Sequence, residues 1–142
     1  SKILTQLMAF SGLTNQIVDL LTSFDLVPVV ALILLMLIPF FLCMFLDQIA
    51  LMLILIPIYV PLVAAFGFDP LVFWTLFLLN LTLGSITPPF GYALFALSAS
   101  SPSEVSLKEI YTASWPFIGL IVLTIVLVGA VPGLATWLPS LL

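Results

Sequence analysis

The sequence predicts an all-α integral membrane protein, and three observations support this fold class. Of the 142 residues, 64% are hydrophobic and only 6% are charged, and the mean hydropathy of +1.45 is far above that of a soluble domain. Uncharged stretches, each long enough to cross a hydrocarbon core of about 30 Å as a helix, cover residues 26–46, 49–68, 70–103 and 110–142. The alternating pattern of barrel strands is missing, and lipid tolerates no unpaired backbone, so helices are expected.

The few ionisable residues exclude several classes of function. With no arginine or histidine, and with Lys2 and Lys108 as its cations, the chain has no electrostatic basis for nucleic-acid binding. Both lysines favour the cytoplasmic side of the membrane by the positive-inside rule. The single Cys43 can form neither an internal disulfide nor a metal cluster, and we expect it to be a small packed residue. We predict no enzymatic activity and no organic cofactor.

Residues 1–25 are predicted to form the end of a transmembrane helix followed by an amphipathic helix at the membrane interface. Gly12 separates the two helices. After it, apolar residues recur at helical spacing, and Asn15, Gln16 and Asp19 lie on the opposite side. Because the chain does not begin with Met and starts within an apolar helix, we expect it to be a fragment or a piece of a longer protein.

Residues 26–67 form two apolar arms joined at residues 44–49, around Asp47. Each arm is long enough to span the bilayer, which favours two ordinary helices with Asp47 in water. The joining segment has no glycine, proline or basic residue, unlike most water-exposed turns, which favours a re-entrant hairpin with its tip inside the bilayer. An acid within the membrane is a functional candidate, either as the anion of a Na⁺ site or as a proton carrier.

Residues 70–98 are predicted to form a discontinuous transmembrane helix with a break at residues 84–91. Pro88 and Pro89 have no amide hydrogen, so the carbonyls of Gly84 and Ser85 lose their helical partners. In lipid an unsatisfied carbonyl costs several kcal/mol, so these groups must meet protein, water or a cation. Since a residue before proline is pushed out of the helical region, the first half-helix should stop near Ile86.

The second half-helix is predicted to start at Pro88 or Pro89, with Thr87 as its cap. The free amides of its first turn would then face the break, namely those of Phe90, Gly91 and Tyr92. Helix-end carbonyls and hydroxyls suit a hard cation, and helix-start amides suit an anion. This arrangement is typical of the discontinuous helices of secondary transporters, whereas the simpler alternative is a proline kink in a packing helix.

Further residues near the break are candidates to face a substrate, namely Pro88, Pro89, Phe90, Gly91 and Asn80. Asn80 lies two turns before the break, and it has a second possible role as a hydrogen-bonding partner of another helix. Residues 99–112 are predicted to be a polar loop with a short helix, capped by Ser103 or Ser106. Residues 113–142 are predicted to hold the last transmembrane helix and the C-terminus, with Trp137 as an interface anchor.

Two segments carry a resemblance to a known family. "MFLDQIALMLILIPIYVPLV" (44–63) and "GFDPLVFWTLFLLNLTLGSITPPFGYALF" (67–95) resemble the C-terminal half of the large membrane subunit of tripartite ATP-independent periplasmic (TRAP) transporters. The resemblance covers nearly the whole chain. It implies one of two inverted repeats of an elevator-type transporter, with a re-entrant hairpin whose tip is at residues 44–49. It also implies a multi-pass protein of a bacterial or archaeal inner membrane.

The resemblance further implies Na⁺-driven import of small organic acids, such as dicarboxylates or sialic acid. The coupling Na⁺ ion would bind between Asp47 of the hairpin tip and the break, at Gly84, Ser85 and Thr87. The implied partners are the N-terminal repeat of the same permease, a small membrane subunit and a soluble periplasmic binding protein. Gln48 departs from the family pattern, which often has proline there, and the first repeat is not in this chain.

Two other classes of function remain alternatives at this point. The first is a non-transporting structural or assembly subunit, or a truncated product, in which the two prolines only kink a packing helix. An ion channel has less support, because a single interrupted helix without an oligomerisation motif gives no ring of carbonyls. Na⁺-dependent uptake of a solute discriminates the transporter from both.

Overall fold

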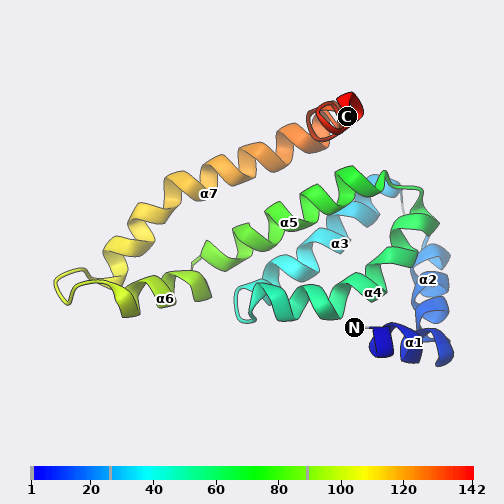
Figure 1. Ribbon diagram of the computed structural model, residues 1–142, viewed down its shortest axis with the longest axis horizontal. Coiled ribbons are helices and arrows are strands. Elements are labelled where there is room, and N and C mark those ends of the chain that lie inside the picture. The colour runs from blue at the N-terminus through cyan, green and yellow to red at the C-terminus, as the bar shows by residue number, and fades with distance from the viewer. Residues whose placement is uncertain (1, 26, 89) are drawn as a thin grey trace.

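A helical hairpin followed by an interrupted helix dominates the computed structural model, which describes residues 2–25, 27–88 and 90–142. Every regular element in these ranges is a helix (Figure 1). In chain order the helices are α1 (Lys2–Phe10), α2 (Leu13–Ser23), α3 (Pro28–Cys43), α4 (Gln48–Phe66), α5 (Pro70–Ile86), α6 (Tyr92–Ser100), α7 (Leu107–Ala130), α8 (Gly133–Thr136) and the 3₁₀ helix η1 (Pro139–Leu141). The predicted all-α fold class is therefore confirmed for the described residues.

The longer helices expose an apolar surface. Among the described residues, α4 and α7 are long and apolar enough to cross a membrane, and α3 and α5 are shorter apolar helices. Large apolar side chains stand exposed along these helices, among them Phe41, Leu53, Phe117 and Val126. Such a continuous apolar exterior suits hydrocarbon rather than water. The depth to which the hairpin enters the bilayer stays a prediction.

Helix α5 occupies the middle of the arrangement (Figure 1). The hairpin of α3 and α4 packs on one side of α5, and α7 runs back along its other side. Tyr59 of α4 contacts both α3 and α5. Its ring lies 6.1 Å from that of Phe73 and 5.6 Å from that of Phe77, both on α5, and its hydroxyl donates to the Leu35 carbonyl of α3 at 2.8 Å. This aromatic core fixes the hairpin against α5.

The interruption of the apolar helix falls between α5 and α6. Helix α5 ends at Ile86, which confirms the predicted end of the first half-helix. The predicted start of the second half-helix is wrong: α6 begins at Tyr92 rather than at Pro88 or Pro89, and Thr87 is the C-cap of α5 rather than the N-cap of α6. Thr87 is extended, with φ −86° and ψ 124°, because it precedes a proline.

The chain enters α6 through a glycine. Gly91 caps this helix with φ +47°, a left-handed backbone conformation that residues other than glycine rarely adopt. A methyl group at this position would lie 3.2 Å from the Thr87 carbonyl oxygen. The helix therefore starts where glycine allows the turn, after the proline pair rather than at it.

The last long helix differs from its predicted division. Helix α7 runs without interruption through Leu107–Ala130, so the short helix expected within residues 99–112 is the first part of α7. Of the caps left open by the sequence, the structure uses Ser106. Its side chain accepts from the Glu109 amide, and the Glu109 carboxylate accepts from the Ser106 amide at 2.8 Å. Because this reciprocal cap starts α7 at Leu107, the helix runs through the predicted boundary between residues 112 and 113.

The N-terminal helices follow the predicted division at Gly12. This glycine has φ +67° and separates α1 from α2. Helix α2 spans Leu13–Ser23, which confirms a helix in the amphipathic segment. Its place at a membrane interface stays a prediction.

Candidate functional site

The hairpin tip and the helix break are in contact. The ring of Phe45, in the tip, lies 4.5 Å from the ring of Phe90, in the break. The backbone amide of Gln48, the first residue of α4, donates to the hydroxyl of Tyr92, the first residue of α6, at 3.4 Å. The two segments that the sequence singled out, far apart along the chain, thus meet at one place.

Gly84 allows α5 to approach the end of α3. A methyl group at Gly84 would lie 2.6 Å from the Phe40 carbonyl oxygen and 3.0 Å from Cβ of Cys43. Both distances are below ordinary contact, and one of the atoms belongs to the backbone. The Cys43 thiol is fully buried here and donates to the Leu81 carbonyl at 3.1 Å. The absence of a side chain at Gly84 is therefore what brings the last turn of α3 onto α5.

The two hydroxyls before the prolines point back along their own helix. Ser85 Oγ donates to the Thr82 carbonyl at 2.7 Å, and Thr87 Oγ1 donates to the Leu83 carbonyl at 2.5 Å. A hydroxyl that donates its proton still offers oxygen lone pairs. Together with the carbonyls of the last turn of α5, these hydroxyls make the end of the helix rich in oxygen ligands of the kind that hard cations prefer.

Asp47 caps α4. Its Oδ2 accepts from the amide of Ile49 at 3.0 Å and from the amide of Ala50 at 3.1 Å, and the residue is exposed in this chain. Both bonds use the same carboxylate oxygen, so Oδ1 takes no part in the cap. Capping and cation binding are therefore compatible roles for this carboxylate.

The first three amides of α4 all have partners. Ile49 and Ala50 donate to Asp47, and Gln48 donates to Tyr92. The start of α4 is consequently not an open anion site in this arrangement. Sequence reasoning missed Tyr92 as a partner of the tip, because its only sequence signal was its place directly after the glycine of the break.

Asn80 takes the second of the two roles that its sequence left open. Its side-chain amide donates to the Met36 carbonyl at 2.6 Å, and the residue is buried between α5 and α3. It thus links two helices, and its role toward a substrate stays a prediction.

The remaining candidates near the break have different surroundings. The Phe90 side chain is exposed beyond its contact with Phe45, and its carbonyl accepts from the Tyr111 hydroxyl of α7 at 3.3 Å. Gly91 is buried and Pro88 is half-buried. The prediction for Pro89 lies outside the described residues.

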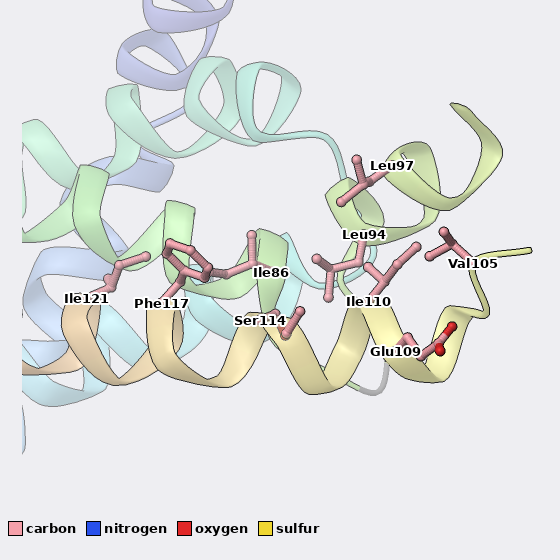
Figure 2. A pocket seen from close by; sticks show the side chains of 10 residues that line it. Ile86, Leu94, Leu97, Val105, Glu109, Ile110, Ser114, Phe117 and Ile121 are labelled. Carbon is pink, nitrogen blue, oxygen red and sulfur yellow. The ribbon is translucent and has the colours of Figure 1, made fainter. Parts of the chain in front are cut away.

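A cavity of about 570 Å³ lies beside the break, between α6 and α7 (Figure 2). Leu94 and Leu97 of α6 lie near Ile110 of α7, Phe117 of α7 lies beside Ile86 at the end of α5, and the Glu109 carboxylate lies at the edge of the cavity. Its lining is almost wholly apolar, and none of the predicted cation ligands contributes to it. Ile86, at the end of α5, is the residue of the break that lines this cavity.

No group of three or more His, Cys, Asp or Glu side chains in the described ranges could hold a metal ion. The oxygen atoms that the break itself offers are backbone carbonyls and the hydroxyls of Ser85 and Thr87. Such a ligand set is hard and of low charge, which fits an alkali cation better than a transition metal.

A hairpin whose tip meets an interrupted apolar helix is an arrangement typical of membrane permeases of the transporter type. The comparison with protein families gives the particular family. Residues 1–134 match the family model described as "Tripartite ATP-independent periplasmic transporter, DctM component". The chain belongs to this family, which confirms the resemblance drawn from residues 44–63 and 67–95.

Three similar proteins illustrate the range of the family. The chain is 34% identical over 98 residues to the C4-dicarboxylate TRAP transporter large permease protein DctM of Vibrio cholerae, covering 69% of this chain and 21% of that protein. It is 33% identical over 114 residues to the sialic acid TRAP transporter large permease protein SiaM of the same species, covering 80% of this chain and 26% of that protein.

The third relative is the ectoine TRAP transporter large permease protein TeaC of Halomonas elongata. It is 34% identical over 99 residues, which cover 70% of this chain and 23% of that protein. The chain thus spans about a fifth to a quarter of the length of these relatives. By their names these relatives are transporter permeases rather than enzymes.

Proposed function

We infer that this chain supplies one cation-binding half of a Na⁺-coupled permease that imports small organic acids across a bacterial or archaeal inner membrane. The observation that carries the proposal is the contact between the hairpin tip and the helix break. Phe45 meets Phe90 and Gln48 meets Tyr92, so the acid-bearing tip adjoins the start of α6, while the end of α3 lies against Gly84 in the last turn of α5. A discontinuous helix whose end faces a second element is how secondary transporters bind coupling ions.

The Na⁺ ion binds at the end of α5 in this proposal. Pro88 leaves the Gly84 carbonyl without its helical donor, and the only bond this carbonyl receives from the cap is a long one, 3.4 Å from the Thr87 amide. Ser85 and Thr87 add hydroxyl oxygens, and Asp47 adds the negative charge. Each Na⁺ ion that enters down a potential of 100 mV contributes about 2.3 kcal/mol to uptake.

The substrate is a small organic acid, in line with the dicarboxylate and sialic acid named for two relatives. This chain has no arginine to clamp a carboxylate. The counter-charge therefore comes from bound Na⁺, from helix-start amides such as those at the beginning of α6, or from the rest of the permease.

The same proposal assigns the partners and the motion. The chain pairs with the N-terminal repeat of its permease and with a small membrane subunit, and a periplasmic binding protein delivers the substrate. The hairpin is re-entrant, and the chain moves as part of a transport domain against a scaffold. Since the chain spans only about a quarter of its relatives, it acts within the complete permease.

Replacement of a single hydroxyl tests the proposed cation site. In proteoliposomes that contain the complete permease and its partners, Thr87→Ala should raise the Na⁺ concentration for half-maximal uptake by about tenfold, equivalent to ~1.4 kcal/mol. Thr82→Ala is the matched control, because Thr82 Oγ1 also donates four residues back, to the Leu78 carbonyl at 3.0 Å, but from an exposed side chain that precedes the break. This control should leave the half-maximal Na⁺ concentration unchanged.

Uptake that does not depend on Na⁺ would contradict the coupling and return the chain to a structural or assembly role. Equal effects of the two threonine substitutions would instead remove Thr87 from the cation site while leaving transport intact.

A further inference from the structure

We propose that Tyr92 is a positioning residue that holds the hairpin tip on the helix break by capping α4 from a different helix. The inference rests on the proposed cation site, because a correctly placed tip is what brings Asp47 to the end of α5. Tyr92 itself touches neither ion nor substrate in this proposal. It acts through the backbone amide of Gln48.

The need for such a residue follows from the start of α4. The first amides of a helix have no partner within the helix, and in lipid an unpaired amide is costly. The Asp47 carboxylate accepts from the second and third of these amides, at Ile49 and Ala50. The first amide, at Gln48, is left over, and the Tyr92 hydroxyl accepts its hydrogen at 3.4 Å.

The turn before α5 shows the same aspartate cap at a helix whose first residue has no amide hydrogen. Asp69 caps α5 with the same pattern, accepting from Leu71 and Val72 at 2.9 Å and 3.3 Å. The residue after Asp69 is Pro70, which has no amide hydrogen. The start of α4 therefore has one amide donor more than the start of α5, and this donor, the Gln48 amide, bonds to Tyr92 of α6.

Further contacts hold the break from both sides. The Phe45 and Phe90 rings pack at 4.5 Å beside the Tyr92 bond. On the other side, the Tyr111 hydroxyl of α7 donates to the Phe90 carbonyl at 3.3 Å, and its ring lies 6.3 Å from that of Phe95 on α6. The break is thereby fixed between the tip and α7, so that movement of the tip is opposed at Tyr92.

The geometry at Asp47 allows a precise genetic test. Asp47 has φ −60° and ψ 137°, which is the conformation that a residue before proline adopts, and close to the φ −63° and ψ 119° of Asp69. Gln48→Pro should therefore fit the first position of α4 while removing the amide that Tyr92 accepts. Tyr92→Phe removes the other half of the same bond and keeps the ring.

The experiment is a double-mutant cycle in the complete permease in proteoliposomes. Tyr92→Phe and Gln48→Pro should each raise the half-maximal Na⁺ concentration by about three- to tenfold, as expected for one hydrogen bond, with little change in maximal rate. The double variant should be no worse than either single variant, because both remove the same bond. Tyr59→Phe is the control: it removes a buried hydroxyl bonded to Leu35, away from the tip, and should leave Na⁺ dependence unchanged.

A second measurement separates failure of this inference from failure of the proposed function. Cys43 is fully buried where the end of α3, next to the tip, lies against α5, so in a permease whose other cysteines have been replaced, its alkylation by a membrane-permeant maleimide reports separation of this end of the hairpin from α5. Tyr92→Phe should accelerate this alkylation and Tyr59→Phe should not, whether or not uptake requires Na⁺. The inference would be overturned if uptake required Na⁺ but Tyr92→Phe changed neither the half-maximal Na⁺ concentration nor the rate of Cys43 alkylation. Additive effects of the two substitutions in the cycle would overturn it as well.

Discussion

The two turns that precede α4 and α5 end in the same way and begin differently. At residues 44–47 and at residues 67–69, an aspartate closes the turn and accepts from the two amides that lie two and three residues further on. The turn at 67–69 starts with Gly67 at φ +71°, whose amide donates to the Ala64 carbonyl at 3.2 Å. This is the glycine-based helix ending that local sequence encodes.

The hairpin tip has no such glycine and no proline. Its path depends on contacts with distant segments: Gly84 admits the end of α3, Phe90 packs on Phe45, and Tyr92 accepts the first amide of α4. One turn is therefore specified by its own residues and the other by its neighbours. A turn that its neighbours hold responds when those neighbours change, which suits a turn that helps to form a binding site.

Two glycine substitutions give the largest expected contrast between the turns. In Gly84→Ala the new methyl group meets the Phe40 carbonyl oxygen at 2.6 Å, so α3 and α5 must separate, at a cost of about 1–3 kcal/mol. Because the tip moves with α3, Na⁺-dependent uptake should also be largely lost. Thermal unfolding and uptake of the complete permease measure both effects.

Gly67→Ala is the matched substitution in the other turn. Nothing lies within 4 Å of the added methyl group, and the strain of φ +71° should cost about 1 kcal/mol without changing Na⁺ dependence. If Gly84→Ala were as stable and as active as Gly67→Ala, the close approach of α5 to α3 would not control the tip.

The two capping aspartates give the next largest contrast. Asparagine caps a helix about as well as aspartate, so Asp47→Asn and Asp69→Asn should both fold. If Asp47 also supplies charge to Na⁺, then Asp47→Asn should raise the half-maximal Na⁺ concentration by about tenfold, or ~1.4 kcal/mol. Asp69→Asn should leave it unchanged. Equally small effects in uptake assays would show that both carboxylates only cap their helices.

The contrast between the turns also explains how far the sequence could predict the structure. The end of α5 at Ile86 follows from two adjacent prolines, which remove two consecutive amide donors and make Thr87 extended. A single proline does not end a helix in this chain, since Pro39 and Pro116 lie inside α3 and α7. The start of α6 was misplaced because proline at the first position of a helix is only a preference. In the structure, Gly91 in a left-handed conformation caps α6, and the Thr87 hydroxyl donates to the Leu83 carbonyl of α5 instead of capping α6.

The missed parts of the site share one physical origin. Tyr92 as a cap, and Gly84 as the place where two helices touch, depend on residues about 40 positions away along the chain. Local propensity contains no information about such partners. The turn at 67–70, by contrast, has local signals in the sequence Gly-Phe-Asp-Pro, since these residue types favour turns wherever they occur.

The smallest expected effect concerns Cys43, which sits where the hairpin tip begins. Its thiol is fully buried and donates to the Leu81 carbonyl at 3.1 Å, so it packs the tip onto α5 without facing the break. Cys43→Ala should lower the free energy of unfolding by about 1 kcal/mol, through the lost contact and the small cavity. The half-maximal Na⁺ concentration should stay the same.

Cys43→Ser sharpens this last prediction, because serine keeps a donor for the Leu81 carbonyl and should recover part of the stability in a thermal unfolding experiment. If either variant changed Na⁺ dependence as strongly as Asp47→Asn, the end of α3 itself would belong to the cation site. The tip would then differ from the turn at 67–69 along its whole length, rather than only at the residues that meet the break.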